Sequence, residues 1–499
     1  MMDLLLPNLV EISLEDCERC QQLPPLGKLR SLKVLIIKGM GALKYIDNNF
    51  YGDTESCFPS LKVLKVRETP CLEEWAAVNG RQHFPLLTSF TIHYCPKLVK
   101  LPMLCFPSLE VLSICKAPCL EEWAAIDGRQ HFPLLTSLTI DDCPKLVKLP
   151  MPKSLKRLGV IGTSVSVLKS LMTNVTVVKY VWISEFPELS GGLLQNQKQL
   201  KELSIDKISV KPPSNLLDNL SSLKRLFLQR WSQLETLPAG LQNLTCLEDL
   251  RVWHCNSLVS LGVNELQCLS SLSSLEINYC QKLRCLSEGV RYLTSLEKMY
   301  IEACPKLNSL PQSIQHLSSL RSMQIWHCEK LISLPNKIQH LARLSELKIS
   351  DCSNLVSLPQ SIQHLSSLRS LCIEDCEKLI SLPNEIMLSE LNILNCSALM
   401  SLPQSIQHLS SLRTLSIRGC DKLISLPNEI QHLAMLSELT ITGCSALMLL
   451  PPGIRSLTAL ERLTIERCPH LERRCQEEDW PTIAHIPYKR ISKEVYHNS

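Results

Sequence analysis

Cysteine is the residue whose spacing in this sequence most strongly suggests chemistry. The 499 residues include 24 cysteines, and many of these recur 24 residues apart, at positions 280, 304, 328, 352 and 376 and again at 420, 444 and 468. Thiolates are nucleophiles and zinc ligands. One cysteine per interval, however, predicts a linear ladder with steps of about 4.8 Å rather than the tetrahedral cluster that zinc adopts. We therefore interpret these cysteines as small buried side chains at a turn.

Other pairs of reactive residues also have structural explanations. Cys17 and Cys20 form the only C-x-x-C motif, and no second pair completes a zinc site. The adjacent carboxylates Glu73–Glu74, and their copy Glu121–Glu122, resemble a catalytic pair, but we interpret both as a duplicated, solvated loop. The dipeptide His327–Cys328, like His254–Cys255, fits an exposed strand residue followed by a buried turn residue.

Histidines of a repeated Q-H-L segment are evenly spaced, which we interpret as a repeated convex surface rather than a shared metal site. These histidines are His316, His340, His364, His408 and His432. The sequence also lacks the G-x-S-x-G and H-E-x-x-H motifs of common hydrolases. We therefore expect no enzymatic activity, with no catalytic residue, no cofactor and no metal.

A pattern of leucines surrounds the cysteines and explains their spacing. Each regular unit has the form L-x-x-L-x-I-x-x-C, followed by x-x-L-x-x-L-P, as in Leu296, Met299, Ile301 and Cys304. The frame occurs 20 times, with first positions at 9, 32, 61, 87, 109, 135, 155, 178, 200, 223, 247, 272, 296, 320, 344, 368, 388, 412, 436 and 460. Cysteine occupies the ninth position thirteen times, and the seven exceptions are Met40, Thr69, Ala117, Thr163, Phe186, Ile208 and Trp231. This is the pattern of a leucine-rich repeat.

The repeat predicts an α/β fold, a leucine-rich-repeat solenoid of about 20 repeats with a horseshoe or superhelical form. Alternating apolar residues in L-x-x-L-x-I predict a short strand, and stacked strands form a parallel sheet on the concave side. The segment P-x-x-I-x-x-L-x-x-L, with Ile314, Leu317 and Leu320, predicts a short helical or 3₁₀ turn on the convex side. Proline suits the first position of such a turn.

Differences in regularity divide the chain into four parts. Residues 1–165 are N-terminal repeats that contain a duplication of 48 residues. Residues 166–222 are an irregular junction, and residues 223–470 are the regular repeats of 24 residues. Residues 471–499 are charged and predict a C-terminal cap and tail, which a solenoid needs. The chain opens directly on a repeat, as though other repeats or another domain should precede it.

The composition is globular and carries no dominant charge. Lys and Arg number 52 against 48 Asp and Glu, a net charge of +4 that is too even to favour nucleic-acid binding. No apolar run approaches the roughly 20 residues of a membrane span. The N-terminal residues lack the features of a signal peptide. We therefore expect the cysteines to remain thiols in a reducing compartment.

The variable positions of each strand are the candidates for binding a partner, because they should point to the concave face. The aromatic and histidine candidates are Trp253, His254, Tyr279, Tyr300, Trp326 and His327, the acidic ones are Asp351, Glu374 and Asp375, and the basic ones are Arg413 and Arg418, with Arg462 and Arg467 farther on. Aromatic residues and arginine dominate interface energetics. The hypothesis is a protein-binding groove with an aromatic centre, an acidic flank and a basic end. The alternative is that exposed strand positions simply accept β-prone aromatic residues.

Several segments resemble the leucine-rich-repeat region of plant intracellular immune receptors, the coiled-coil, nucleotide-binding, leucine-rich-repeat disease resistance proteins. They are LPNLVEISLEDC at 6–17, LPPLGKLRSLKVLIIKGM at 24–40, the FPSLKVLKV and CLEEW segments around Trp75 and Trp123, and CPHLERRCQEEDWPTIAHIPYKRI at 468–491. The last is similar to the usual terminus of the family, although a glycine common before E-D-W is missing. The resemblance covers essentially the whole chain.

The resemblance implies a recognition domain that senses pathogen effectors and contributes to defence. It implies protein partners, namely an effector, a guarded host protein or the receptor's own nucleotide-binding module, with no nucleic acid and no membrane span. It also implies a location in the cytoplasm, the nucleus or the periphery of the plasma membrane. The sequence contains no G-x-x-x-x-G-K-[ST] phosphate loop, so nucleotide binding is not expected of this chain. The alternative is a stand-alone scaffold, such as a decoy, a regulator or the substrate-recognition subunit of a ubiquitin ligase.

Overall fold

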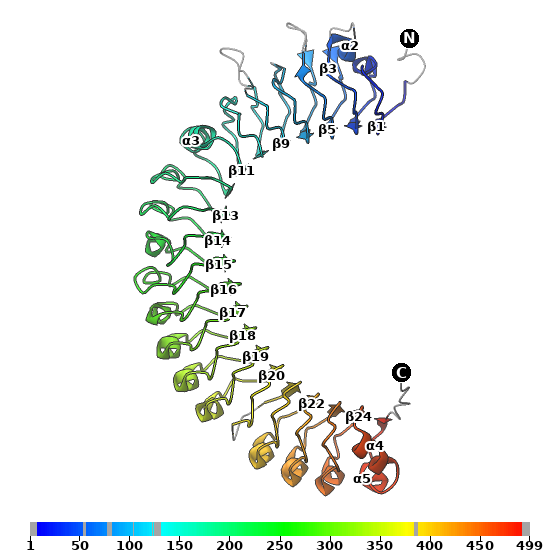
Figure 1. The fold of residues 1–499 in the computed structure, drawn as a ribbon, viewed down its shortest axis with the longest axis vertical. Helices are drawn as coiled ribbons and strands as arrows, with labels where there is room; N and C mark the ends of the chain where they lie inside the picture. Colours follow the sequence, from blue (N-terminus) through cyan, green and yellow to red (C-terminus); the bar gives the residue numbers. More distant parts are fainter. Residues whose placement is uncertain are drawn as a thin grey trace. The chain divides into compact units, whose positions relative to one another are not determined.

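The computed structural model describes residues 7–52, 56–76, 82–102, 104–121, 123, 131–383 and 388–491. The chain forms two compact units, Met1–Phe227 and Leu228–Ser499. Each unit is a stack of repeats, and each repeat contributes one short strand to a parallel sheet (Figure 1). The predicted leucine-rich-repeat solenoid with its parallel sheet is confirmed.

The described residues of the first unit form one long parallel sheet and two small ones. The strands of the long sheet, in order of pairing, are β1 (Glu11–Glu15), β2 (Val34–Lys38), β5 (Val63–Arg67), β8 (Ser89–His93), β9 (Val111–Cys115), β10 (Ser137–Asp141), β11 (Arg157–Ile161), β12 (Tyr180–Ser184) and β13 (Glu202–Asp206). The small sheets pair β3 (Tyr45–Ile46) with β6 (Glu74–Trp75) and β4 (Ser56–Cys57) with β7 (Gln82–His83). The strand β14 (Arg225–Gln229) spans the boundary between the units.

The second unit repeats the same arrangement with greater regularity. Its strands pair in chain order as β15 (Asp249–Trp253), β16 (Ser274–Asn278), β17 (Lys298–Glu302), β18 (Ser322–Trp326), β19 (Glu346–Ser350), β20 (Ser370–Glu374), β21 (Glu390–Leu394), β22 (Thr414–Arg418), β23 (Glu438–Thr442), β24 (Arg462–Glu466) and β25 (Tyr488–Ile491). Within this unit the strands line the concave side of the stack (Figure 1).

Short helices occupy the convex side of the repeats, as the sequence predicts. The 3₁₀ helices are η1 (Leu26–Lys28), η2 (Leu241–Asn243), η3 (Glu288–Tyr292), η4 (Gln312–His316), η5 (Asn336–His340), η6 (Gln360–His364), η7 (Gln404–His408), η8 (Asn428–His432) and η9 (Pro452–Ser456). The α-helices are α2 (Asn48–Tyr51), α3 (Val165–Asn174), α4 (Pro469–Gln476) and α5 (Trp480–Ile483). Pro311 lies just before η4 as its N-cap rather than inside its first turn. Proline suits this place because it has no N–H to leave unpaired.

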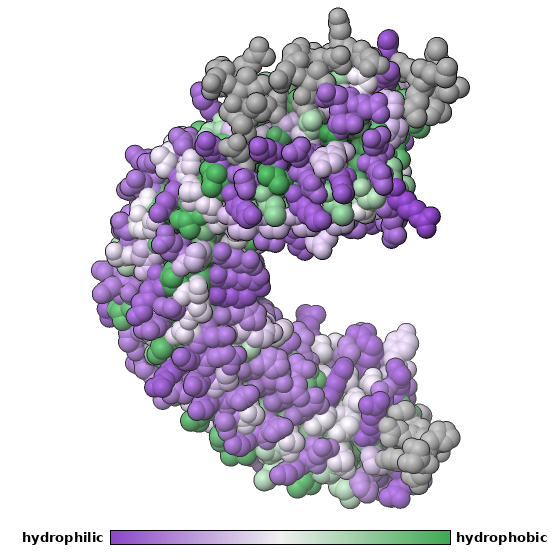
Figure 2. Space-filling model, turned by 45° about the horizontal axis from the view of Figure 1, so that its top comes forward, coloured by the Kyte–Doolittle hydropathy of each residue, from purple (hydrophilic) through white to green (hydrophobic). Residues whose placement is uncertain are grey.

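The apolar positions of the frame build the interior of each repeat. In the second unit, Leu275, Met299 and Met323 face one another across neighbouring strands and are almost completely buried. The visible face of the molecule is therefore mostly hydrophilic (Figure 2). Each fully buried side chain of this size contributes roughly 1.5–3 kcal/mol, and no single repeat could bury its own apolar face alone.

The ninth position of the frame is buried, as predicted, in every repeat except the first. Cys352 and Cys396 are 0% exposed, and their Sγ atoms donate to the Ser350 and Leu394 carbonyls at 3.5 and 3.4 Å. The seven residues that replace cysteine at this position are buried as well. The prediction is wrong at Cys17, which is exposed. It follows β1, which pairs on one side only, with β2, among the described residues.

Thiol reactivity is expected to separate buried from exposed cysteines. Burial raises the pKa of Cys352 and of Cys396 from 9.0 to about 11, so at pH 8 both are protonated and shielded from Ellman's reagent. Cys17, Cys246 and Cys268 are exposed and should react first. Peptide mass spectrometry after a short exposure checks this, and early labelling of Cys352 would contradict it. These two thiols ionise at a lower pH in the unfolded chain than in the folded chain. Their contribution to the free energy of unfolding should therefore be complete below pH 9 and decrease as the pH rises towards 11.

The eighth position of the frame has a left-handed backbone in all 20 repeats, with φ between 45° and 65°. Only four of these residues are glycine, namely Gly39, Gly162, Gly419 and Gly443. The turn directs the ninth side chain inward, and the eighth N–H donates to the seventh carbonyl of the following strand, as from His254 to Asn278 at 2.8 Å. This conformation costs a non-glycine residue roughly 1–2 kcal/mol. Packing of the neighbouring repeats therefore imposes it.

Replacing Ala303 by glycine is expected to stabilise the protein by about 0.5–1 kcal/mol, because it removes the left-handed penalty at φ 51° and loses only a methyl group. Gly443→Ala is the matched reverse change, since φ is 63° and the nearest atom to an added Cβ lies at 3.6 Å. It should destabilise by a similar amount. Urea unfolding followed by circular dichroism measures both. A loss of stability in Ala303→Gly would contradict the backbone argument.

A continuous series of aromatic rings fills the interior of the first unit. Phe58, Phe84, Phe106 and Phe132 stack in turn, with centroids 5.0, 5.9 and 6.1 Å apart. The tryptophans of the two CLEEW segments are buried as well: Trp123 packs against Phe106 and Phe132, and Trp75 packs against Phe50 and Phe90. Trp123 Nε1 donates to the Pro102 carbonyl at 3.0 Å. The rings add to the buried leucines of the same repeats, such as Leu87 and Leu109.

The C-terminal segment covers the last regular repeat. β25 adds a parallel strand beside β24, α4 contacts both strands, and α5 lies beside η9. Leu471, Cys475 and Ile483 are buried. The carboxylate of Glu472 is also buried and accepts the Cys468 N–H at 2.9 Å. This ionisable group is therefore held by a backbone hydrogen bond at the start of α4.

Candidate functional site

The parallel register places equivalent side chains of successive strands in rows across the sheet. In the seventh position the row is Trp253, Asn278, Glu302 and Trp326, from β15 to β18. The fifth position places Glu276, Tyr300 and Gln324 in a neighbouring row. Since strand residues alternate between faces and the leucine positions point inward, these side chains stand on the solvent face.

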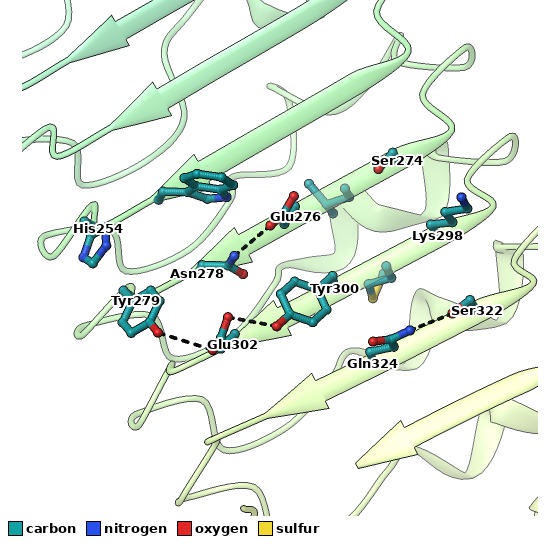
Figure 3. Close-up of a pocket in the computed structure, with 13 residues that line it drawn as sticks. His254, Ser274, Glu276, Asn278, Tyr279, Lys298, Tyr300, Glu302, Ser322 and Gln324 are labelled. Carbon is teal, nitrogen blue, oxygen red and sulfur yellow. Dashed lines mark hydrogen bonds between the residues drawn. The ribbon is translucent and has the colours of Figure 1, made fainter. Parts of the chain in front are cut away.

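A cavity of about 610 Å³ opens between these two rows (Figure 3). Four of the predicted binding residues line it: Trp253, His254, Tyr279 and Tyr300. The other polar and charged lining residues are Ser274, Glu276, Asn278, Lys298, Glu302, Ser322 and Gln324, none of which the sequence analysis selected. We call this cavity the β15–β18 pocket. Its volume falls within the range of small-molecule and peptide side-chain sites.

Glu302 is the shared hydrogen-bond acceptor of two tyrosines in the pocket. Tyr279 Oη donates to Glu302 Oε1 at 3.3 Å, and Tyr300 Oη donates to Glu302 Oε2 at 2.8 Å. Both hydroxyls point toward this carboxylate from opposite sides (Figure 3). No cationic side chain within the described ranges forms an ion pair with Glu302. Each carboxylate oxygen therefore keeps acceptor capacity.

The tyrosines remain hydrogen-bond donors at neutral pH. The negative charge of Glu302 raises the pKa of Tyr279. Burial raises the pKa of Tyr300, and its hydrogen bond to Glu302 raises it further. Both effects disfavour a second negative charge beside the carboxylate. The aromatic rings consequently act as neutral walls around one anionic group.

Glu276, a second carboxylate that lines the pocket, belongs to a network with Arg251 of β15, which lies outside the lining. The Arg251 guanidinium binds Asp249 at 2.9 Å and Glu276 at 3.4 Å. Asn278 Nδ2 donates to Glu276 Oε1 at 2.8 Å. The carboxylate of Glu276 is thus already engaged by both a cation and an amide, unlike that of Glu302.

Trp326 and His327 lie next to the pocket without lining it. Trp326 packs edge-on against Tyr300, with centroids 5.3 Å apart, and Lys348 Nζ lies over its ring at 4.7 Å. His327 Nδ1 lies 3.6 Å from Asp351 Oδ2. Trp326 thus extends the aromatic surface along β18, and Lys348 of β19 lies against it.

The predicted flanks are spread along the sheet rather than gathered at the pocket. Glu374 on β20 forms an ion pair with Lys348 at 3.9 Å, and Asp375 occupies the left-handed turn that follows. Arg413 precedes β22 and is exposed, so it occupies the second position and not one of the rows of the sheet. Arg418 ends β22 and donates from Nε to Ser416 Oγ at 3.2 Å. The acidic candidates therefore adjoin the aromatic ones, since Asp351 lies beside His327, whereas Arg413 and Arg418 lie at β22, four strands beyond β18.

The sequence pairs with metal-binding or catalytic potential have other roles. Cys17 Sγ and Cys20 Sγ donate to the Glu15 and Gln22 carbonyls at 3.5 and 3.0 Å. His316 lies on η4 beside Gln315 Nε2 at 3.4 Å. In the part of the chain that the structure describes, no group of three or more His, Cys, Asp or Glu side chains is placed to hold a metal. Glu122 lies outside the described residues.

None of the helices in the described ranges has the length and hydrophobicity to span a bilayer. The longest of them is α3, which buries Val167, Leu168, Leu171 and Met172 against its own unit. Its remaining face carries polar side chains.

Comparison with known proteins shows that parts of the chain are similar to plant disease resistance proteins. Residues 1–40 match the family described as R13L1/DRL21 leucine-rich repeats. RGA1 of Solanum bulbocastanum, named as a disease resistance protein, is 32% identical over 96 residues, which are 19% of this chain and 10% of that protein. The disease resistance protein RPS6 of Arabidopsis thaliana is 32% identical over 136 residues, which are 26% of this chain and 11% of that protein. The matched part thus spans about a tenth of the length of these relatives.

A solved structure supports the fold over almost the whole chain. The crystal structure of the mouse RP105/MD-1 complex superposes with a TM-score of 0.51 at 16% identity. The superposition covers 97% of this chain and 84% of that chain. At this identity the similarity concerns the repeat architecture alone.

Proposed function

We propose that this chain, whose repeats are similar to the leucine-rich-repeat region of plant disease resistance proteins, is a non-enzymatic recognition surface that binds a protein during plant defence. The partner is a pathogen effector or a host protein that the effector modifies. If the chain is part of a longer receptor, its repeats also contact a nucleotide-binding module. The proposed location is the cytoplasm, with the nucleus or the plasma-membrane periphery as further sites of action.

The β15–β18 pocket is the observation that carries this proposal. Its walls are tryptophan and tyrosine, the residue types that dominate binding energy at protein interfaces. The rigid sheet holds these rings in place, so little conformational entropy is lost when a partner binds. The carboxylates of the pocket are engaged by phenols, an amide and an arginine, an arrangement suited to recognition rather than proton transfer.

The experiment compares affinity capture by three forms of the chain. The double variant Trp253→Ala and Trp326→Ala removes one tryptophan that lines the pocket and one beside it, and Trp480→Ala removes an exposed tryptophan on α5 as a matched control. Each form is incubated with extract from pathogen-challenged plant cells, and bound proteins are quantified by mass spectrometry. We expect a protein that the wild type and Trp480→Ala retain and that the double variant loses at least tenfold, equivalent to about 1.4 kcal/mol.

Equal capture of every enriched protein by the double variant would contradict the proposal. Circular dichroism of each variant separates this result from a loss of folding. Both substituted tryptophans lie on the solvent face of the sheet and are only partly buried. The repeats should therefore remain folded without them.

A further inference from the structure

The polar atoms of the β15–β18 pocket show which kind of group it can accept. Glu302 carries a negative charge that no described cation balances, and its partners are two neutral phenols. Asn278 is 6% exposed, and its Oδ1 has no hydrogen-bond partner within the described chain. Buried polar atoms in proteins are almost always paired. The pocket thus presents an anion and an unsatisfied acceptor, both of which require N–H donors.

Trp253 requires a hydrogen-bond acceptor, whereas Glu302 and Asn278 require donors. Its Nε1 is buried and has no acceptor among the described residues. An amide carbonyl next to a donor-rich group would satisfy it. A peptide provides both kinds of group within one residue, whereas an isolated metal ion or a simple amine provides only one.

The charge distribution also selects the orientation of a ligand. Arg251 is engaged by Asp249 and Glu276, so it leaves Glu302 unopposed on its side of the pocket. Lys298 lies at the other end of β17, four residues from Glu302 and therefore about 13 Å away along the strand (Figure 3). A cationic group is attracted to the Glu302 end and repelled from the Lys298 end.

Arginine fits these features better than lysine. Its planar guanidinium stacks on aromatic rings and offers five N–H donors in a fixed fork. The fork can serve Glu302 and Asn278 together, while the rings of Tyr279 and Tyr300 flank the plane. Lysine offers a compact charge with no plane to stack.

We propose that the β15–β18 pocket binds an arginine side chain from an exposed segment of a protein partner, with Glu302 as its counter-ion. This inference rests on the proposed function and adds the chemistry by which the surface selects a partner. The guanidinium completes the ion pair that Glu302 lacks and donates to Asn278. The peptide carbonyl beside it accepts the Trp253 N–H.

The test uses the full chain and three peptides of the form acetyl-Gly-Gly-X-Gly-Gly-amide, in which X is arginine, citrulline or lysine. Citrulline has nearly the shape of arginine but no charge. Binding is followed by ligand-observed NMR titration. We expect the arginine peptide to bind at least tenfold more tightly than the citrulline peptide and more tightly than the lysine peptide.

Two variants connect the result with Glu302. Glu302→Gln keeps the size of the side chain and removes its charge, and it should weaken binding of the arginine peptide at least tenfold. Glu346→Gln is the matched control on β19, since Glu346 lies on the same face and does not line the pocket. It should leave binding unchanged.

Equal binding of the arginine and citrulline peptides, or unchanged binding by Glu302→Gln, would overturn the inference. Failure here is distinguishable from failure of the proposed function. If no peptide discriminates while the tryptophan double variant still loses its partner, the surface binds proteins but without selecting arginine. If neither effect occurs, both proposals are wrong.

Discussion

Deleting residues 344–367, one complete repeat, is expected to leave the second unit folded, whereas deleting residues 344–355 is expected to unfold much of it. The complete deletion joins Arg343 to Leu368 and keeps the frame, so β18 can pair with β20 as it now pairs with β19. In a solenoid each repeat contacts only its neighbours, and one unit can be removed with a small change in stability.

The half deletion removes β19 but keeps the outer part of its repeat. The strands on either side then lose their shared neighbour, and the leucines that faced it become exposed. Several side chains of this size are involved, each contributing roughly 1.5–3 kcal/mol, so the loss should exceed about 5 kcal/mol. That is comparable with the whole stability of a typical domain.

One repeat of the chain is already shorter than the others, which indicates that changes of length outside the strand are tolerated. The step from Leu368 to Leu388 is 20 residues instead of 24, yet β20 pairs with β21 in unbroken register, from Ser370 with Glu390 to Glu374 with Leu394. Circular dichroism and urea unfolding of both deletions provide the measurement. Comparable unfolding of the two would show that the repeats do not behave as separate stacking units.

Replacing Trp123 by alanine is expected to lower the free energy of unfolding of the first unit by about 3–5 kcal/mol. The side chain is 1% exposed and touches Phe106 and Phe132, with centroids 6.0 and 5.2 Å away. Its removal leaves a cavity between rings that cannot easily move closer. It also leaves the Pro102 carbonyl without its indole donor.

Trp182→Ala is the matched control in the same unit. Trp182 stands on the solvent face of β12 and is 43% exposed, so its loss should cost less than about 1 kcal/mol. Urea unfolding of both variants gives the comparison. Equal losses would mean that the aromatic interior does not stabilise the unit more than an exposed ring does.

The sequence was sufficient to predict the fold because the regular spacing of the repeat determines which residues of successive strands lie side by side. Spacing alone identified the first, fourth and sixth positions as buried and the ninth as a buried turn residue, and the structure agrees at Leu296, Met299, Ile301 and Cys304. It did not predict the left-handed eighth residue. Sixteen of the 20 residues there are not glycine, so composition gave no signal of the conformation that packing imposes.

The candidate site was only partly predictable for a different reason. Selecting aromatic residues found Trp253, Tyr279 and Tyr300, but it passed over Glu302 and Asn278 in the same rows. Neighbours in a row are separated by about 24 residues in sequence, so reading down the seventh position could have found both. Which carboxylate lacks a cation depends on side-chain directions, and these do not follow from spacing.

The aromatic interior of the first unit was missed because it does not follow the leucine frame. Phe50 and Trp75 lie in segments between frames, and their burial depends on rings contributed by neighbouring repeats. The duplicated CLEEW segments indicated the family resemblance, but they did not indicate that their tryptophans are buried.

Site-specific photo-cross-linking tests whether the sheet face around Glu302 is the recognition surface. Benzoylphenylalanine replaces Gln324 on β18 in one form of the chain and Gln315 on η4 in another, so that two glutamines on opposite sides of neighbouring repeats are compared. Both forms are irradiated in extract from pathogen-challenged plant cells. We expect a discrete protein adduct from position 324 that disappears when Trp253→Ala is added, and none from position 315. Adducts from position 315 alone, or an adduct from position 324 that Trp253→Ala leaves unchanged, would contradict this expectation.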